Sequence, residues 1–68
     1  MKEIENFMYY MFNRWSLEEA KKVFGDDLGT HIYGKWQDTD DTLIWFGWLD
    51  KECRRKISDR ANEIYNKQ

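Results

Sequence analysis

The amino-acid sequence predicts an all-α protein, a small compact bundle of four to five short helices with an aromatic-rich core. Apolar residues recur at helical spacing along most of the 68 residues, and recognisable helix caps divide these segments. Proline is absent, and twelve residues are aromatic, four each of Trp, Tyr and Phe. We therefore expect residues 1–68 to form a single domain, with helices over residues 3–14, 17–24, 27–36, 42–48 and 50–66.

The first two helices follow from an apolar stripe and a capping motif. The spacing i, i+3, i+4, i+7, i+8, i+11 predicts one buried face for the first helix, formed by Ile4, Phe7, Met8, Met11, Phe12 and Trp15. Ser16 and Glu19 then match the S-x-x-E pattern of a capping box, so a second helix should begin at residue 17. Gly25 is placed to end this helix in a left-handed conformation.

The third helix has weaker support. Leu28, Ile32 and Trp36 are spaced by four residues, which is typical of one face of a helix, and Asp26 or Asp27 could cap its start. Two glycines lie inside this segment, and each weakens a helix by about 1 kcal/mol relative to alanine.

The alternative for this part of the chain is an α+β fold with a β-hairpin at about residues 30–48. Residues 42–48 are rich in β-branched and aromatic side chains, and residues 38–41 could form the turn. An isolated two-stranded hairpin is only marginally stable in water, so we favour helices.

The last helix has a regular apolar stripe. Its members are spaced by four, four, four and three residues: Leu49, Cys53, Ile57, Ala61 and Ile64. Asp50 precedes the stripe and is a candidate N-cap. We expect the first and last helices to pack together, with Trp15, Trp36 and either Trp45 or Trp48 at the centre of the core.

Residue types needed for catalysis or metal binding are scarce. Cys53 and His31 are the single cysteine and histidine, so the chain can form neither an internal disulfide nor a structural zinc site. The cluster Asp38, Asp40 and Asp41 begins like a calcium loop, but leucines occupy the sixth and twelfth positions, which require Gly and Glu. We interpret this cluster as a turn and helix cap, and expect no enzymatic activity, no cofactor and no metal.

The sequence predicts a cytoplasmic location. The N-terminal residues do not form a secretion signal, and the longest apolar run, residues 43–49, is far shorter than the ~20 residues that cross a bilayer. A lone cysteine is typical of a reducing compartment. We expect no association with membranes.

Residues 44–49 are apolar on nearly every side, which favours an interaction surface. A helix that is apolar all round must be buried on all sides, and a chain of 68 residues can hardly enclose one. We therefore expect Trp45, Phe46 and Trp48, together with Tyr33, to form an exposed aromatic patch. The predicted function is a small non-enzymatic protein–protein interaction or accessory module, which self-associates as a homo-oligomer or docks on a larger partner.

The alternative function is a small DNA-binding or DNA-associated regulator. Residues 18–25 resemble the first half of a helix-turn-helix, with a recognition helix at about residues 27–36. The net charge of −2 is uneven, since residues 1–50 carry five basic and ten acidic side chains and residues 51–68 carry six and three. The candidate phosphate contacts are Lys51, Arg54, Arg55, Lys56 and Arg60. A pI of about 5.3 argues against this alternative, because nucleic-acid-binding domains typically exceed ~9.

Overall fold

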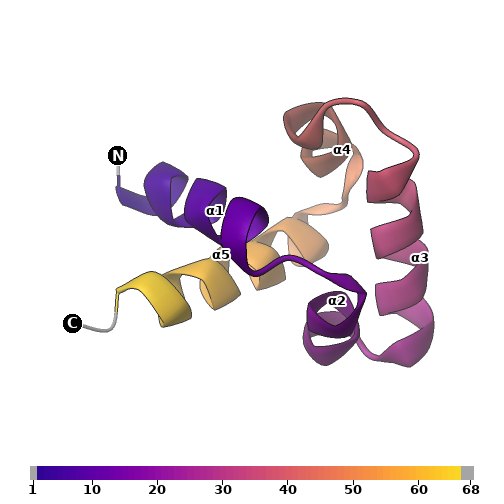
Figure 1. The fold of residues 1–68 in the computed structure, drawn as a ribbon, viewed down its shortest axis with the longest axis horizontal. Helices are drawn as coiled ribbons and strands as arrows, with labels where there is room; N and C mark the ends of the chain where they lie inside the picture. Colours follow the sequence, from indigo (N-terminus) through magenta and orange to yellow (C-terminus); the bar gives the residue numbers. More distant parts are fainter. Residues whose placement is uncertain (1, 67–68) are drawn as a thin grey trace.

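A computed structural model of the chain describes residues 2–66, which form five helices (Figure 1). These are α1 (Lys2–Asn13), α2 (Leu17–Phe24), α3 (Asp26–Gln37), α4 (Thr42–Trp48) and α5 (Lys51–Tyr65). The predicted all-α fold is confirmed, and each helix boundary lies within one residue of its predicted position. The hairpin alternative is wrong, because α3 and α4 occupy the segment that it would need.

Three of the predicted caps are confirmed by their hydrogen bonds. The Ser16 hydroxyl accepts the Glu19 backbone N–H at 3.1 Å at the start of α2. Asp41 accepts the Leu43 backbone N–H at 2.9 Å and so begins α4, as expected for the acidic cluster. Asp50 accepts the Cys53 backbone N–H at 2.8 Å and begins α5. Side-chain acceptors satisfy N–H groups that a helix N-terminus would otherwise leave unpaired.

Gly25 both ends α2 and begins α3. Its φ of +92° is a backbone conformation that glycine adopts without steric cost, and its N–H donates to the Lys21 carbonyl at 2.7 Å. Asp26 and Asp27 therefore lie in the first turn of α3. The prediction that either of them caps this helix is wrong, because the N-cap position belongs to Gly25.

The helices pack as two pairs joined at one end (Figure 1). Helices α1 and α5 pack side by side, as predicted, and they run in opposite directions. The Asn6 amide donates to the side-chain oxygens of Asn62 and Asn66, both at 2.9 Å. Helices α2 and α3 make the other pair. Gly29 is buried there, and a Cβ at this position would lie only 2.5 Å from the Ala20 carbonyl oxygen. A glycine is therefore required for the close approach of α2 and α3.

Side chains from all five helices meet in a hydrophobic core within residues 2–66. Trp45 is 1% exposed, and its ring lies 5.6 Å from that of Trp15, which is also buried. The Trp45 indole N–H donates to the Ile32 carbonyl at 3.2 Å, which ties α4 to α3. The prediction that Trp36 lies at the centre is wrong, because this side chain is half-buried at the edge of the core, and Trp48 lies outside it. The core therefore uses Trp45 where the sequence left Trp45 and Trp48 as alternatives.

The buried face of α1 differs from the predicted stripe. Phe7 and Met11 are buried as expected, but Ile4 and Phe12 are exposed. Asn6 and Tyr10 are buried in their place, on the same side of the helix as Phe7 and Met11. The helix is thus rotated by about one residue position, roughly 100°, relative to the apolar stripe. No helix within residues 2–66 is long and apolar enough to cross a membrane.

Candidate docking surface

Helix α4 directs its large apolar side chains to two opposite sides. On the inner side, Trp45 is buried in the core. On the outer side, Leu43, Ile44 and Trp48 are 62%, 50% and 71% exposed. Successive residues of a helix are separated by about 100°, so positions 43, 44, 47 and 48 share one side. We call the side formed by Leu43, Ile44, Gly47 and Trp48 the outer face of α4.

A hollow lies on each flank of α4. The hollow on the α1 side has a volume of about 330 Å³ and is lined mostly by apolar side chains: Glu3, Ile4, Phe7, Met8, Leu43, Phe46 and Ser58. We call it the α1/α4 hollow. The hollow on the α3 side has about 250 Å³ and is lined by His31, Ile32, Lys35, Trp45, Trp48 and Leu49. The exposed Trp48 thus lies at the α3 flank, in the hollow that the cationic Lys35 also lines. The α1 flank carries the carboxylate of Glu3.

Gly47 lies in the middle of the outer face. It is exposed, and a Cβ built at this position would have no atom within 4 Å. Nothing within residues 2–66 therefore requires a glycine here, although glycine weakens the helix by about 1 kcal/mol relative to alanine. The missing side chain leaves the centre of the outer face open between Leu43, Ile44 and Trp48.

The predicted aromatic patch is placed only in part as expected. Trp48 is exposed, and Phe46 is half-buried with its ring 4.6 Å from that of Phe7. Trp45 cannot belong to an exposed patch, because it is in the core. Tyr33 is half-buried and stacks near Trp36, with the ring centroids 5.3 Å apart.

The predicted patch omits three exposed apolar residues of this surface, Ile4, Leu43 and Ile44. Ile4 belongs to α1, far from α4 in sequence, and was assigned to the buried stripe. Leu43 and Ile44 belong to the first turn of α4, and Leu43 lines the α1/α4 hollow together with Ile4. A helical-wheel analysis of residues 42–48 with Trp45 facing the core would have found Leu43 and Ile44, but no local signal places Ile4 next to Leu43.

The basic residues of α5 are largely engaged within the protein. Arg55 forms ion pairs with Glu52 at 2.6 Å and Asp59 at 3.2 Å, and Arg54 donates to the Leu49 carbonyl. Lys51 and Lys56 are exposed and form no ion pair within residues 2–66. Two isolated lysines are a small electrostatic footprint for binding a phosphate backbone.

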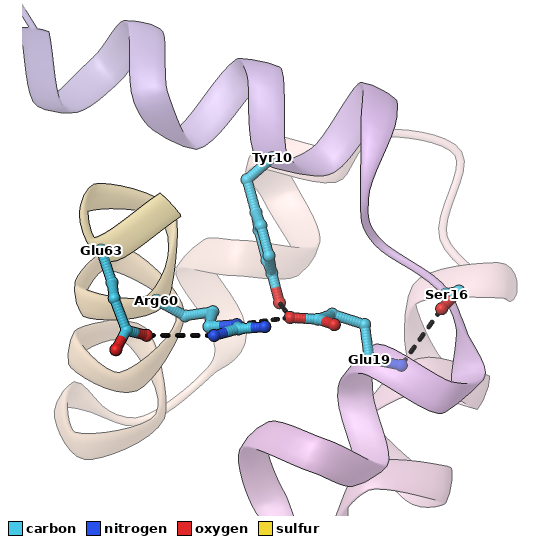
Figure 2. Close-up of polar contacts among 5 residues, drawn as sticks. All are labelled: Tyr10, Ser16, Glu19, Arg60 and Glu63. Atoms are coloured by element: carbon cyan, nitrogen blue, oxygen red, sulfur yellow. Dashed lines mark hydrogen bonds and ion pairs between the residues drawn. The ribbon is translucent and has the colours of Figure 1, made fainter. Parts of the chain in front are cut away.

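Arg60, the fifth candidate phosphate contact, belongs to a polar network that joins α1, α2 and α5 (Figure 2). Its Nε donates to Glu19 Oε1 at 2.6 Å, and its Nη1 donates to Glu63 Oε1 at 3.0 Å. The Tyr10 hydroxyl donates to the same Glu19 oxygen at 3.0 Å. Glu19 therefore does not complete the predicted capping box with Ser16, because its carboxylate turns toward Tyr10 and Arg60 (Figure 2).

The network perturbs the protonation of its members. Burial by itself would raise the pKa of the Glu19 carboxyl, but the hydrogen bonds from Arg60 and Tyr10 outweigh burial and lower this pKa below its ordinary value. Burial, reinforced by the negative charge of Glu19, raises the pKa of the Tyr10 hydroxyl. The hydrogen bonds to Glu19 and Glu63 raise the pKa of Arg60. All three groups thus keep their ordinary charge at neutral pH.

The α2–α3 pair differs from a DNA-binding helix-turn-helix in two respects. Its connection is Gly25 alone, whereas the motif has a turn of three to four residues. Asp26 and Asp27 occupy the first turn of α3, the end at which a recognition helix contacts bases and phosphates. Two carboxylates at that position would repel the DNA backbone.

The single cysteine and the single histidine lie on different helices, α5 and α3. Cys53 is half-buried, and burial together with the nearby Asp50 carboxylate raises the pKa of its thiol. His31 is exposed on α3 and lines the hollow beside Trp48. Within residues 2–66, no group of three or more His, Cys, Asp or Glu side chains could hold a metal ion.

Comparison of the chain with protein-family models, with curated proteins and with solved structures finds no match. Function is therefore inferred from the surface itself.

Proposed function

We propose that this chain is a small non-enzymatic protein–protein interaction module, and that the outer face of α4, with the adjoining α1/α4 hollow, is its docking surface. One observation carries the proposal. A helix of seven residues leaves Leu43, Ile44 and Trp48 each at least half exposed, and Ile4 extends the apolar surface across the hollow. Contiguous exposed apolar surface of this kind typically marks an interaction site.

The energetics of the exposed side chains support this role. Complete burial of a large apolar side chain contributes about 1.5–3 kcal/mol, and the isolated chain gains little of this from Trp48. A partner that covers Trp48 would gain it, and tryptophan is among the residues most enriched at interface hot spots. The fold itself does not depend on Trp48, since Trp45 supplies the indole at the core.

The proposal also includes a cytoplasmic location. A single half-buried thiol with a raised pKa is unreactive, and a protein with no disulfide is suited to a reducing compartment.

Affinity capture from a lysate of the natural host tests this function. The tagged chain, its Trp48→Ala variant and its Leu28→Ala variant should be compared with and without nuclease. Leu28 is an exposed leucine at the start of α3, outside the docking surface, and serves as the matched control. We expect the wild type and Leu28→Ala to retain a stoichiometric protein partner and Trp48→Ala to lose it, with no effect of nuclease. An untagged copy of the chain counts as such a partner.

Two results would contradict the proposal. Capture that disappears on nuclease treatment would favour the DNA-associated alternative and the exposed lysines of α5. Capture that is unchanged by Trp48→Ala would show that the outer face of α4 is not the docking surface.

A further inference from the structure

We propose that the occupant of this surface is a second copy of the chain, related to the first by a two-fold axis, with Trp48 of each copy seated in the α1/α4 hollow of the other. The inference rests on the proposed docking role of α4. It adds the identity of the partner and the residues that meet across the interface.

The first argument is the placement of a projecting side chain and a hollow on opposite flanks of the same helix. Trp48 projects at the α3 flank of α4, and the α1/α4 hollow of about 330 Å³ opens at the other flank. A two-fold interface pairs one surface with itself, so features on opposite sides of the axis are brought together. A two-fold axis that lies in the interface and runs along α4, over its outer face, therefore places the Trp48 of each copy over the hollow of the other, in two equivalent contacts.

The second argument is charge. Lys35 lines the hollow at the Trp48 flank, together with His31, and Glu3 lines the α1/α4 hollow. The same two-fold axis that seats Trp48 also brings Lys35 of each copy near Glu3 of the other. Opposite charges at the rim of an apolar contact set orientation and specificity. A surface that carries both signs, one on each flank, is complementary to itself.

The third argument is Gly47. This residue lies at the centre of the outer face, where the axis would pass, and no atom lies within 4 Å of the position its Cβ would occupy. The distance between packed helices depends on the side chains at the contact, so a glycine there allows the two α4 helices to approach closely. Packing within the isolated chain does not require a glycine at this position, whereas close contact between the two α4 helices of the dimer does.

A dimer of ordinary size would bury a substantial share of this small chain's surface. A standard interface takes about 800 Å² from each partner, roughly one sixth of the 4852 Å² accessible surface. A chain this short also buries a smaller share of its surface than a larger domain does, and association with a second copy is a common remedy.

Sedimentation equilibrium over a wide concentration range tests the inference. We expect the wild type and Leu28→Ala to form a dimer, and Trp48→Ala to dissociate at least ~100-fold more easily, because a hot-spot side chain is removed from two equivalent contacts. Gly47→Gln favours the helix itself but places a long side chain on the axis, so it should weaken the dimer without lowering the melting temperature of the monomer.

Charge reversal gives the sharper test of the arrangement. Glu3→Lys and Lys35→Glu should each weaken self-association by ~10-fold, since each creates two like-charge contacts. An equimolar mixture of the two variants should form a heterodimer of near wild-type affinity, because both rim contacts then join opposite charges. No such recovery would overturn the proposed arrangement.

The outcomes separate the identity of the partner from the docking function. A wild-type chain that stays monomeric at every concentration would overturn the second-copy proposal. If that monomer still captures a different protein in a Trp48-dependent way, the docking surface stands and its occupant is another protein. If nothing binds in a Trp48-dependent way, both proposals fail.

Discussion

Replacing Gly29 with alanine probes the contact between α2 and α3 at its tightest point. The added Cβ would lie 2.5 Å from the Ala20 carbonyl oxygen and 2.7 Å from the Lys21 Cα, distances at which one of the helices must move. Overpacking a dense region costs about 1–3 kcal/mol, and a clash with backbone belongs at the upper end of that range. Alanine recovers about 1 kcal/mol of helix propensity, so we expect a net loss of about 2 kcal/mol.

Thermal unfolding followed by circular dichroism measures this loss. For a chain of this size, 2 kcal/mol corresponds to a fall in melting temperature of about 8–16 °C. Gly34→Ala is the matched control, because Gly34 lies in the same helix and an added Cβ would have no atom within 4 Å. That variant should gain about 0.5–1 kcal/mol and melt a few degrees higher. A Gly29→Ala variant as stable as Gly34→Ala would refute the close packing of α2 on α3.

Three further predictions concern the polar network and the tryptophans. Arg60→Ala should destabilise the fold by about 3 kcal/mol in urea unfolding, since it leaves the buried Glu19 carboxylate without its cation. Tyr10→Phe should cost about 1 kcal/mol, because it removes one hydrogen bond from a neutral donor. Equal losses from the two variants would contradict the role of Arg60 as the main partner of this carboxylate. The folded state lowers the pKa of Glu19. The contribution of this carboxylate to the free energy of unfolding is therefore complete above its ordinary pKa of about 4.3, and it is lost as the pH falls through the folded pKa. Melting temperatures measured toward pH 2 should therefore fall more steeply for the wild type than for Glu19→Gln, and parallel curves would contradict this assignment. Trp45→Ala should lower the free energy of unfolding by about 3–5 kcal/mol and Trp48→Ala by less than about 1 kcal/mol, as measured by chemical unfolding. The reverse order would mean that the inner and outer sides of α4 are exchanged.

Local signals account for how well the helices were predicted. Ser16, Gly25 and Asp50 act on backbone groups within a few residues of themselves, so their roles follow from sequence spacing. The same holds for Asp41 at the start of α4. Each of these signals is independent of how the helices pack against one another.

The buried face of α1 could not be predicted in this way. Asn6 and Tyr10 are buried with polar partners on other helices, Asn62 of α5 for the amide and Glu19 of α2 for the hydroxyl. Apolar periodicity does not detect such pairs, so the stripe through Ile4 and Phe12 was the stronger signal and it was misleading. With Asn6 and Tyr10 buried, the opposite side of α1, which carries Ile4, faces solvent.

The exposure of the predicted aromatic patch on α4 agrees with the structure only in part, since Trp48 is exposed as expected but Trp45 is buried. An all-apolar segment shows that part of α4 must be exposed, but the side that faces the core is the one from which the buried Trp45 indole donates to the Ile32 carbonyl. That bond joins residues on two helices and has no local signature. Trp48 and Trp45 are therefore distinguished only by the tertiary structure.

A series of two-dimensional ¹H–¹⁵N NMR spectra, recorded from micromolar to millimolar concentration, tests the central claim most directly. With the second copy as the partner, the Trp48 indole signal and the amides of Leu43, Ile44 and Gly47 should shift as the protein is concentrated, as should Glu3. The Trp45 indole N–H, already bonded within the core, should not move. Spectra that do not change at these positions, or changes confined to the basic residues of α5, would contradict the assignment of the outer face of α4 as the surface that binds the second copy.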